Sequence, residues 1–121
     1  MAPPTPLPAY VYKIVPSPPP SPIPPQYPLS DLDQQDGFVH LSIATQIPIT
    51  AGLFFKESTN LWILRIRFKP EFHGTTTWEV TGCPHLYGNF GADDVEDVKQ
   101  FTRSEGESWK DAMERQRGFL I

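Results

Sequence analysis

The sequence predicts a small single α+β domain with a mostly antiparallel, split β-sheet and two or three helices. The chain has 121 residues, a length typical of one domain that buries a core of its own. Short runs rich in Val, Ile, Thr and aromatic residues are separated by Gly, Pro and Asp, which is typical of strands and turns. Two segments, one central and one C-terminal, have apolar residues at helical spacing.

Prolines frame the first predicted strand. All but three of the 15 prolines lie within the first 28 residues, in two tracts on either side of residues 9–15 (AYVYKIV). Proline cannot donate a ladder hydrogen bond, so the tracts border this strand rather than enter it. We expect residues 1–9 to form a proline-rich tail and residues 16–28 to form a stiff, extended surface loop. A ligand for an SH3-type domain is the alternative interpretation of this loop.

A short strand and a helix are expected next. Residues 37–42 (GFVHLS) follow a turn signal and have the composition of a strand. Residues 45–55 (TQIPITAGLFF) predict a helix with Pro48 in its first turn, where the missing N–H costs little. The residues expected on its buried face are Ile47, Ala51, Phe54 and Phe55.

The second half of the chain alternates strands with turns. Residues 60–68 (NLWILRIRF) give the clearest strand. Its apolar residues alternate with Arg65 and Arg67, so one face is expected to be buried and the other wet. Further strands are expected at residues 75–80 (TTTWEV), 85–91 (HLYGNFG, a strand or turn) and 95–102 (VEDVKQFT). Residues 107–120 predict a helix that packs on the body of the domain.

Composition and charge argue against several classes of protein. The formal net charge is −4 and no Lys/Arg run is present, so we expect no nucleic-acid partner. No apolar run reaches the ~18 residues of a membrane span, and the N-terminus does not resemble a signal peptide. The lone Cys83 cannot form an intrachain disulfide, and we expect a buried thiol. The sequence therefore predicts a cytoplasmic protein without a membrane partner and leaves the oligomeric state open.

Two of the three histidines lie in apolar, strand-like segments. Burying an imidazole costs free energy unless its nitrogens find partners, so His40 and His85 could each be a satisfied core residue. Their neighbours favour a site instead, because residues two apart on a strand share a face, which places Ser42 beside His40 and Tyr87 beside His85. Glu79 adds a carboxylate in a strand otherwise suited to burial. We expect these five side chains to converge in one cleft.

Strand alternation also makes a prediction about the packing around this cleft. We expect Phe38 and Trp78 to be buried, on the strand faces opposite His40 and Glu79.

Other chemistry has less support in the sequence. Two histidines and Glu79 could offer two nitrogens and an oxygen to zinc, but no motif with metal-ligand spacing is present, so no metal site is predicted. The phosphate-binding motifs GxxxxGK[ST] and GxGxxG are absent, and so is the GxSxG elbow of hydrolases.

Several motifs resemble those of one known family. DGFVHLS (residues 36–42) with Gln46, and PHLYG (residues 84–88), occur in the order and at the spacing typical of the domain of unknown function 952 (DUF952) family. YKIV, FF, LWILRI and WE match as well, so the resemblance covers roughly residues 12–101. It implies a fold like that of the ADP-ribosyltransferase superfamily, a split sheet around an NAD-sized cleft.

The resemblance also implies roles for individual residues. His40 with Ser42 would hold a ribose of NAD, and Tyr87 would stack on the nicotinamide. Glu79 would stabilise positive charge as the glycosidic bond breaks, and His85 would act as a general base toward an acceptor. The candidate catalytic residues are therefore His40, Glu79 and His85. The candidate substrate-binding residues are Ser42, Tyr87, Phe38 and Gln46.

The chain departs from the family pattern in two places. Members typically have a helical segment after the first strand, whereas residues 16–27 (PSPPPSPIPPQY) cannot be helical. The predicted C-terminal helix is an addition, so we divide the chain into a DUF952-like domain at residues 10–103 and a helical extension at residues 104–121. Either change could reshape the pocket for another small molecule.

Three hypotheses about function follow, because a fold does not fix an activity. The first is a small-molecule enzyme that uses the His/Glu/Tyr cleft for acid–base catalysis of an isomerisation, cyclisation or elimination, without a cofactor. The second is an ADP-ribosyltransferase-like enzyme with NAD as its cofactor. The third is a non-catalytic module that binds a ligand or a protein.

Overall fold

The computed structural model describes residues 3–116 and 118–120. It is a small α+β fold with two antiparallel sheets of three strands each. The central sheet has the order β1 (Tyr10–Val15), β3 (Asn60–Arg67), β6 (Val95–Thr102). The small sheet has the order β2 (Val39–His40), β5 (Cys83–Leu86), β4 (Thr76–Val80). The predicted α+β class and the antiparallel pairing are confirmed.

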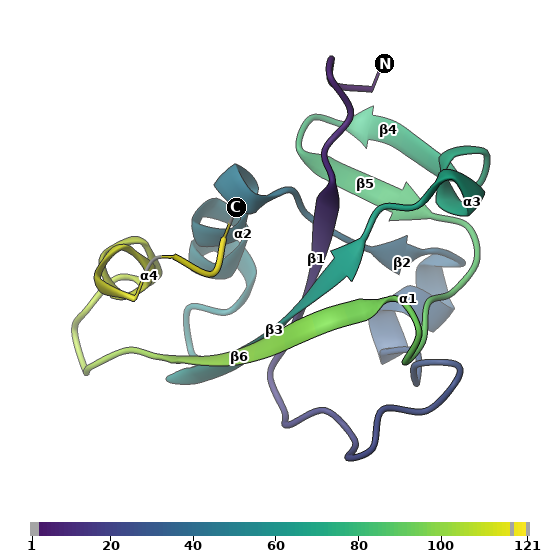
Figure 1. Ribbon diagram of the computed structural model, residues 1–121. Helices are drawn as coiled ribbons and strands as arrows, with labels where there is room; N and C mark the ends of the chain where they lie inside the picture. Colours follow the sequence, from purple (N-terminus) through teal and green to yellow (C-terminus); the bar gives the residue numbers. More distant parts are fainter. Residues whose placement is uncertain (1–2, 117, 121) are drawn as a thin grey trace.

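The described residues form four α-helices, one more than the upper limit predicted. They are α1 (Asp31–Asp36), α2 (Ile47–Phe54), α3 (Pro70–His73) and α4 (Trp109–Arg115). Figure 1 shows α2 and α4 on one side of the central sheet, and the small sheet with α1 and α3 on the other. Among the described residues, no helix has both the length and the apolar character needed to cross a membrane.

Two hydrophobic clusters lie on opposite faces of the central sheet. One cluster joins it to the small sheet and includes Val11, Leu64, Ile66, Val39 and Leu86. The other joins it to α2 and α4 and includes Tyr12, Ile63, Phe101, Ala51 and Trp109. The prediction of one wet face for residues 60–68 therefore holds only at the end of the strand, where Arg67 is exposed and Arg65 half-buried. The face that carries Leu61 and Ile63 is buried because the two helices cover it.

The two sheets are joined at Ser42. Strand β2 has only two residues, but the chain runs on to Ser42, which exchanges two backbone hydrogen bonds with Tyr12 of β1, at 2.8 and 2.9 Å. Because Lys13 follows Tyr12 along β1, this bridge places the end of β2 beside a lysine of the central sheet. The candidate functional site lies at this junction.

Helix α1 is an element that the sequence prediction missed. Ser30 caps its N-terminus, with its side chain accepting a hydrogen bond from the Asp33 amide at 3.1 Å. Gly37 ends the helix with a left-handed backbone, at a φ of 81°, which glycine adopts without strain. Asp31 and Asp33 in the first turn complete a pattern typical of a helix start.

The proline-rich residues 16–28 contain no helix or strand, as expected. The end of this loop packs on the segment after β5, where the Tyr27 and Phe90 rings stack at 5.0 Å. A Cβ on Gly91 would lie 1.7 Å from the carbonyl oxygen of Pro25, so the close approach of the two segments requires glycine here. The docked loop leads the chain directly into α1.

Candidate functional site

The two candidate histidines lie side by side on one face of the small sheet. His40 of β2 pairs with His85 of β5, and His85 pairs with Thr77 of β4. Directly paired residues of antiparallel strands share a face, so the three side chains form a row. The two imidazole centroids are 5.8 Å apart.

Phe38 completes an aromatic cluster on this face. Its ring stacks on His85 at 4.0 Å and lies 4.5 Å from His40 and 5.2 Å from Tyr87. The expectation that Phe38 is buried on the face opposite His40 is wrong, because residues 38 and 40 are two apart in an extended segment and therefore share a face. Phe38 is half-buried against the two imidazoles.

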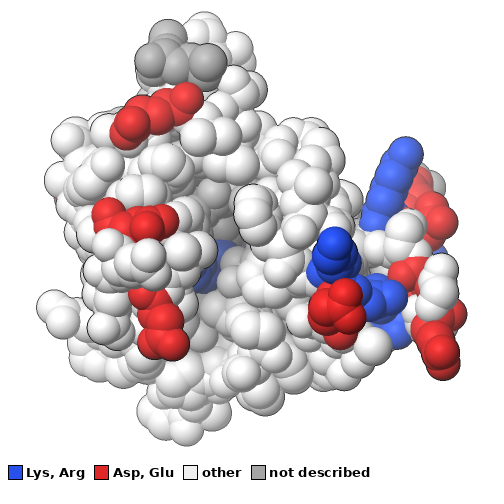
Figure 2. All heavy atoms as spheres, turned by 180° about the vertical axis from the view of Figure 1, so that it is seen from behind, with Lys and Arg blue, Asp and Glu red and all other residues white. Residues whose placement is uncertain are grey.

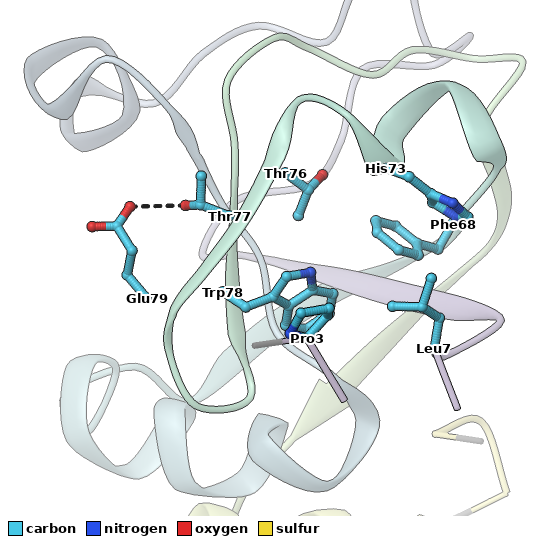
Figure 3. Close-up of a pocket in the computed structure, with 8 residues that line it drawn as sticks. All are labelled: Pro3, Leu7, Phe68, His73, Thr76, Thr77, Trp78 and Glu79. Carbon is cyan, nitrogen blue, oxygen red and sulfur yellow. Dashed lines mark hydrogen bonds between the residues drawn. The ribbon is translucent and has the colours of Figure 1, made fainter. Parts of the chain in front are cut away.

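Glu79 lies on the outer part of this face. Figure 3 shows Thr77 and Glu79 on one side of β4 and Trp78 on the other, toward Phe68. Trp78 is buried, as predicted, and packs edge-to-face on Phe68 at 5.8 Å. Glu79 is exposed and accepts a hydrogen bond from the Thr77 hydroxyl at 2.9 Å. It lines a separate, smaller hollow of about 450 Å³.

A cavity of about 750 Å³ opens beside the histidine pair, within the size range of small-molecule sites. Its walls come from β1, α1, α2 and the small sheet. Figure 2 shows this hollow from behind, with a basic side chain at its bottom and acidic side chains along one side. The polar residues in the wall include Lys13, Asp33, Asp36, His40, Ser42, Thr50, Cys83 and His85.

Only part of the predicted set lines this cavity. His40, His85 and Ser42 do, whereas Phe38, Gln46, Glu79 and Tyr87 are not among its lining residues. Phe38 and Tyr87 lie next to the histidine pair, as described above. Gln46 packs under the turn between β4 and β5, where its Oε1 would be 3.0 Å from a Cβ on Gly82.

A buried ion pair forms the floor of the cavity. The Lys13 ammonium lies 2.7 Å from Asp33 Oδ2, and the side chains are 8% and 2% exposed. Lys13 also donates to the His40 carbonyl oxygen at 3.2 Å. Burial lowers the pKa of Lys13, and Asp33 opposes that shift. Burial would raise the pKa of Asp33, but Lys13 and the hydrogen bonds from His40 outweigh it, so this pKa lies below its usual range.

Two carboxylates hold the His40 ring. Nδ1 lies 2.6 Å from Asp33 Oδ1, and Nε2 lies 2.9 Å from Asp36 Oδ2. The His40 backbone amide also donates to Asp33 Oδ1 at 3.1 Å. An imidazole donates through both nitrogens only when it is protonated, so this arrangement is suited to an imidazolium. The Asp33 contact fixes the ring from inside the protein, whereas Asp36 is exposed.

The environment of His85 favours a neutral ring, unlike that of His40. Burial lowers the pKa of His85, and the charge of His40 lowers it further, while Glu79 and Asp36 act weakly in the other direction. A pKa below the ordinary value of about 6.5 leaves this ring neutral at pH 7. Its Nδ1 is buried and has no hydrogen-bond partner in the described part of the chain. A neutral imidazole therefore stands beside one that two carboxylates hold, and such a contrast is typical of acid–base pairs.

Two further cavity residues carry small reactive or polar groups. Thr50 of α2 has a buried hydroxyl that makes no hydrogen bond to any described residue. Cys83 is a free, half-buried thiol rather than the buried one expected. No group of three or more His, Cys, Asp or Glu is placed to hold a metal ion within residues 3–116 and 118–120.

Lys13, Asp33 and Asp36 line the cavity but were not predicted from the sequence. The sequence around Lys13 could have indicated its role. A lysine flanked by Tyr12 and Ile14 in an apolar strand needs a buried partner. For Asp33 and Asp36 the sequence shows only the helix pattern of α1, because their role depends on contacts between separate elements.

The chain matches the family described as "Protein of unknown function (DUF952)" over residues 24–98, and it belongs to that family. The crystal structure of protein CC0527 from Caulobacter crescentus is similar, with a TM-score of 0.63, 25% identity, and coverage of 78% of this chain and 88% of that one. The solution NMR structure of CC0527 gives a TM-score of 0.69 at 21% identity, covering 91% and 97% of the two chains.

No curated protein matches the sequence. The comparisons thus support the DUF952 family and the α+β fold, and they give no support to the ADP-ribosyltransferase-like fold that the sequence motifs implied.

Proposed function

We propose that this protein is an enzyme that performs acid–base catalysis on a small organic molecule bound in the cavity beside His40 and His85. One observation carries the proposal: the ring centroid of a neutral histidine, His85, lies 5.8 Å from that of His40, whose ring nitrogens both contact carboxylates. Both rings line the same cavity. Perturbed titratable groups that converge on one cavity are typical of active sites.

The two histidines take complementary roles in this proposal. Neutral His85 accepts a proton from the substrate, and protonated His40 donates one to another atom of it. If the second proton reaches the substrate skeleton, the reaction is an isomerisation or cyclisation, and if it reaches a leaving group, the reaction is an elimination. Proton exchange with water then returns both rings to their starting states.

The neighbouring carboxylates support His40 in different ways. Asp33, which is buried, stays hydrogen-bonded to Nδ1 and fixes the plane of the ring. Asp36 is exposed at the end of α1, so its side chain can turn away and free Nε2 for the substrate. Glu79 lies outside the cavity and acts on the charge of His85 from a distance, rather than on the substrate.

An NAD-dependent reaction fits this cavity less well. A pyrophosphate is normally bound by free cations or by the N-terminus of a helix in a glycine-rich loop. Among the described residues, Lys13 is the only Lys or Arg that lines the cavity, and Asp33 already neutralises it. Asp31 and Asp36 add further negative charge to the wall. The cavity therefore favours the cofactor-free hypothesis.

Metabolite profiling tests the proposal without a known substrate. The wild-type protein is incubated with a mixture of small metabolites, and mass spectrometry with chromatography detects any component that is converted. We expect His85→Asn and His40→Gln to slow that conversion by roughly 10²–10⁴-fold, because each amide can hydrogen-bond but cannot carry the proton.

His73→Asn is the matched control. His73 lies in α3 and lines the smaller hollow, not this cavity, so its replacement should leave the conversion unchanged. A His85→Asn variant as active as wild type would contradict the acid–base proposal. A protein that binds a component of the mixture and converts none would be a binding module.

A further inference from the structure

We infer that the ligand of this cavity is an amphipathic molecule with an apolar body and a neutral or cationic head, such as an alcohol or an amine. The inference rests on the proposed function, because it concerns the molecule that would react there. Two features of the cavity support it: its apolar mouth and the sign of its charge.

The mouth of the cavity exposes large apolar side chains from three elements. Leu32 of α1, Phe54 of α2 and Val80 of β4 all line the cavity and are exposed. Phe54 was expected to face the core, but it lies at the last residue of α2 and is 75% exposed. An exposed apolar cluster on a monomer is typical of a ligand or interaction surface. Here the cluster surrounds a cavity of small-molecule size, so an apolar ligand body fits it.

The charge of the cavity disfavours an anionic head. Asp31 and Asp36 are exposed in its wall, whereas both contacts of the Lys13 ammonium, to Asp33 and to the His40 carbonyl, are internal. Among the described lining residues, an anionic group would thus find no free lysine or arginine, and the nitrogens of the His40 ring already contact Asp33 and Asp36. It would also meet the like charges of Asp31 and Asp36. Figure 2 shows the same asymmetry, with acidic side chains beside the hollow. A cationic or neutral head avoids this repulsion.

The test uses three probes with one apolar chain and different heads: octylamine, octanol and octanoate. Each is titrated, below its micelle-forming concentration, into the full-length ¹⁵N-labelled protein at neutral pH and low salt. We expect octylamine and octanol to shift the amide signals of α1, α2 and the small sheet. Octanoate should bind at least about tenfold more weakly, because it meets like charge near Asp31 and Asp36.

Asp31→Asn tests the origin of this preference. Asp31 is exposed, lines the cavity and has no part in the proposed proton transfer. Removing its charge should reduce the difference in affinity between octylamine and octanoate. Added salt should reduce the same difference. Asp111 lies in the first turn of α4 and outside the cavity. Asp111→Asn should therefore leave the difference in affinity unchanged.

The possible results separate this inference from the proposed function. Octanoate that binds as tightly as octylamine, or a cavity that none of the probes perturbs, would overturn the inference. If the probes bind as expected but His85→Asn converts the substrate as fast as wild type, the inference stands and the acid–base proposal fails. If profiling finds a converted substrate with an anionic head, the proposal stands and the inference fails.

Discussion

At the scale of single residues, Asp33 connects groups from two strands. One carboxylate oxygen contacts Lys13 of β1, and the other contacts both the ring and the backbone amide of His40 in β2. Together with Asp36, whose exposed side chain contacts His40 Nε2, it ties helix α1 to the strands. The same carboxylate therefore positions the candidate catalytic ring and neutralises the buried lysine.

Replacing Asp33 should destabilise the fold strongly. Asp33→Asn removes one charge of a buried pair and leaves Lys13 uncompensated, which typically costs about 3–5 kcal/mol of unfolding free energy. Chemical denaturation measures this loss. Asp31→Asn, at an exposed position of the same helix, should cost only about 0.3–1 kcal/mol from its interaction with the helix dipole. Equal losses in the two variants would contradict a buried pair.

The pKa of His85 predicts how stability depends on pH. Because the pKa of His85 is lowered by burial and by His40, the folded protein binds this proton less well than the unfolded chain does. Stability should therefore fall as the pH drops below about 6.5, the ordinary pKa of histidine. Melting temperatures between neutral pH and about pH 5 should show a smaller drop in His85→Asn than in wild type.

His73→Asn is the control for this prediction and should keep the wild-type pH dependence. The lowered pKa of Asp33 affects stability in a separate pH range. Its contribution to stability is lost only as the pH falls below about 3.9. A His85→Asn variant with the same acid-induced loss as wild type would show that His85 is not the group responsible.

Sequence predicted the site at the level of its histidines and missed the groups that support them. His40 and His85 stood out because each is a polar ring in an apolar strand, and they pair directly across β2 and β5. Glu79 fits the same face but lies beyond the cavity, because the register between β4 and β5 shifts after Thr77. Asp33 could not be assigned, since its partners are distant in sequence and meet only in the folded chain.

At the scale of elements, composition and local periodicity predicted most strands and two of the helices. Strand β3 was predicted from alternation, β1 and β6 from residues typical of strands, and α2 and α4 from helical spacing. Helix α1 was missed because six residues are too few to show a helical period. Its cap residues, Ser30 and Gly37, are nevertheless typical of a helix start and end. The division of the strands into two sheets depends on long-range pairing that no local pattern encodes.

Helix α4 should contribute substantially to stability, although it lies outside residues 24–98, the part that matches the family. Trp109 is buried in the cluster under α2 and donates its indole N–H to the Phe55 carbonyl at 2.9 Å. Trp109→Ala should lower the unfolding free energy by about 3–5 kcal/mol, measured by denaturant titration. Trp109→Phe, which keeps most of the packing, should cost less. A negligible loss for Trp109→Ala would mean that α4 is not docked in solution.

At the scale of the whole molecule, the central sheet couples the two hydrophobic clusters. Neighbouring residues of β1 point to opposite faces, so Val11 packs in one cluster and Tyr12 in the other. Disrupting either cluster removes support from the same three strands. The domain should therefore unfold as one unit.

Tryptophan fluorescence can test this cooperativity, because Trp78 and Trp109 report on different clusters. In a Trp62→Phe background, one variant keeps Trp78 alone and a second keeps Trp109 alone. Each fluorescence transition is compared with the circular dichroism transition of the same variant. We expect the two probes of each variant to have coincident denaturation midpoints. A fluorescence transition that is separated from loss of secondary structure would show that the clusters unfold independently.

The electrostatic coupling of the two histidines can be measured directly by NMR titration of their ring nitrogens. In the wild-type protein we expect His85 to titrate below the ordinary value of about 6.5, because of burial and the nearby charge of His40. In His40→Gln the pKa of His85 should rise back toward that value, and in Glu79→Gln it should fall further. A His85 that titrates at or above its ordinary value and does not respond to His40→Gln would contradict the account of this site.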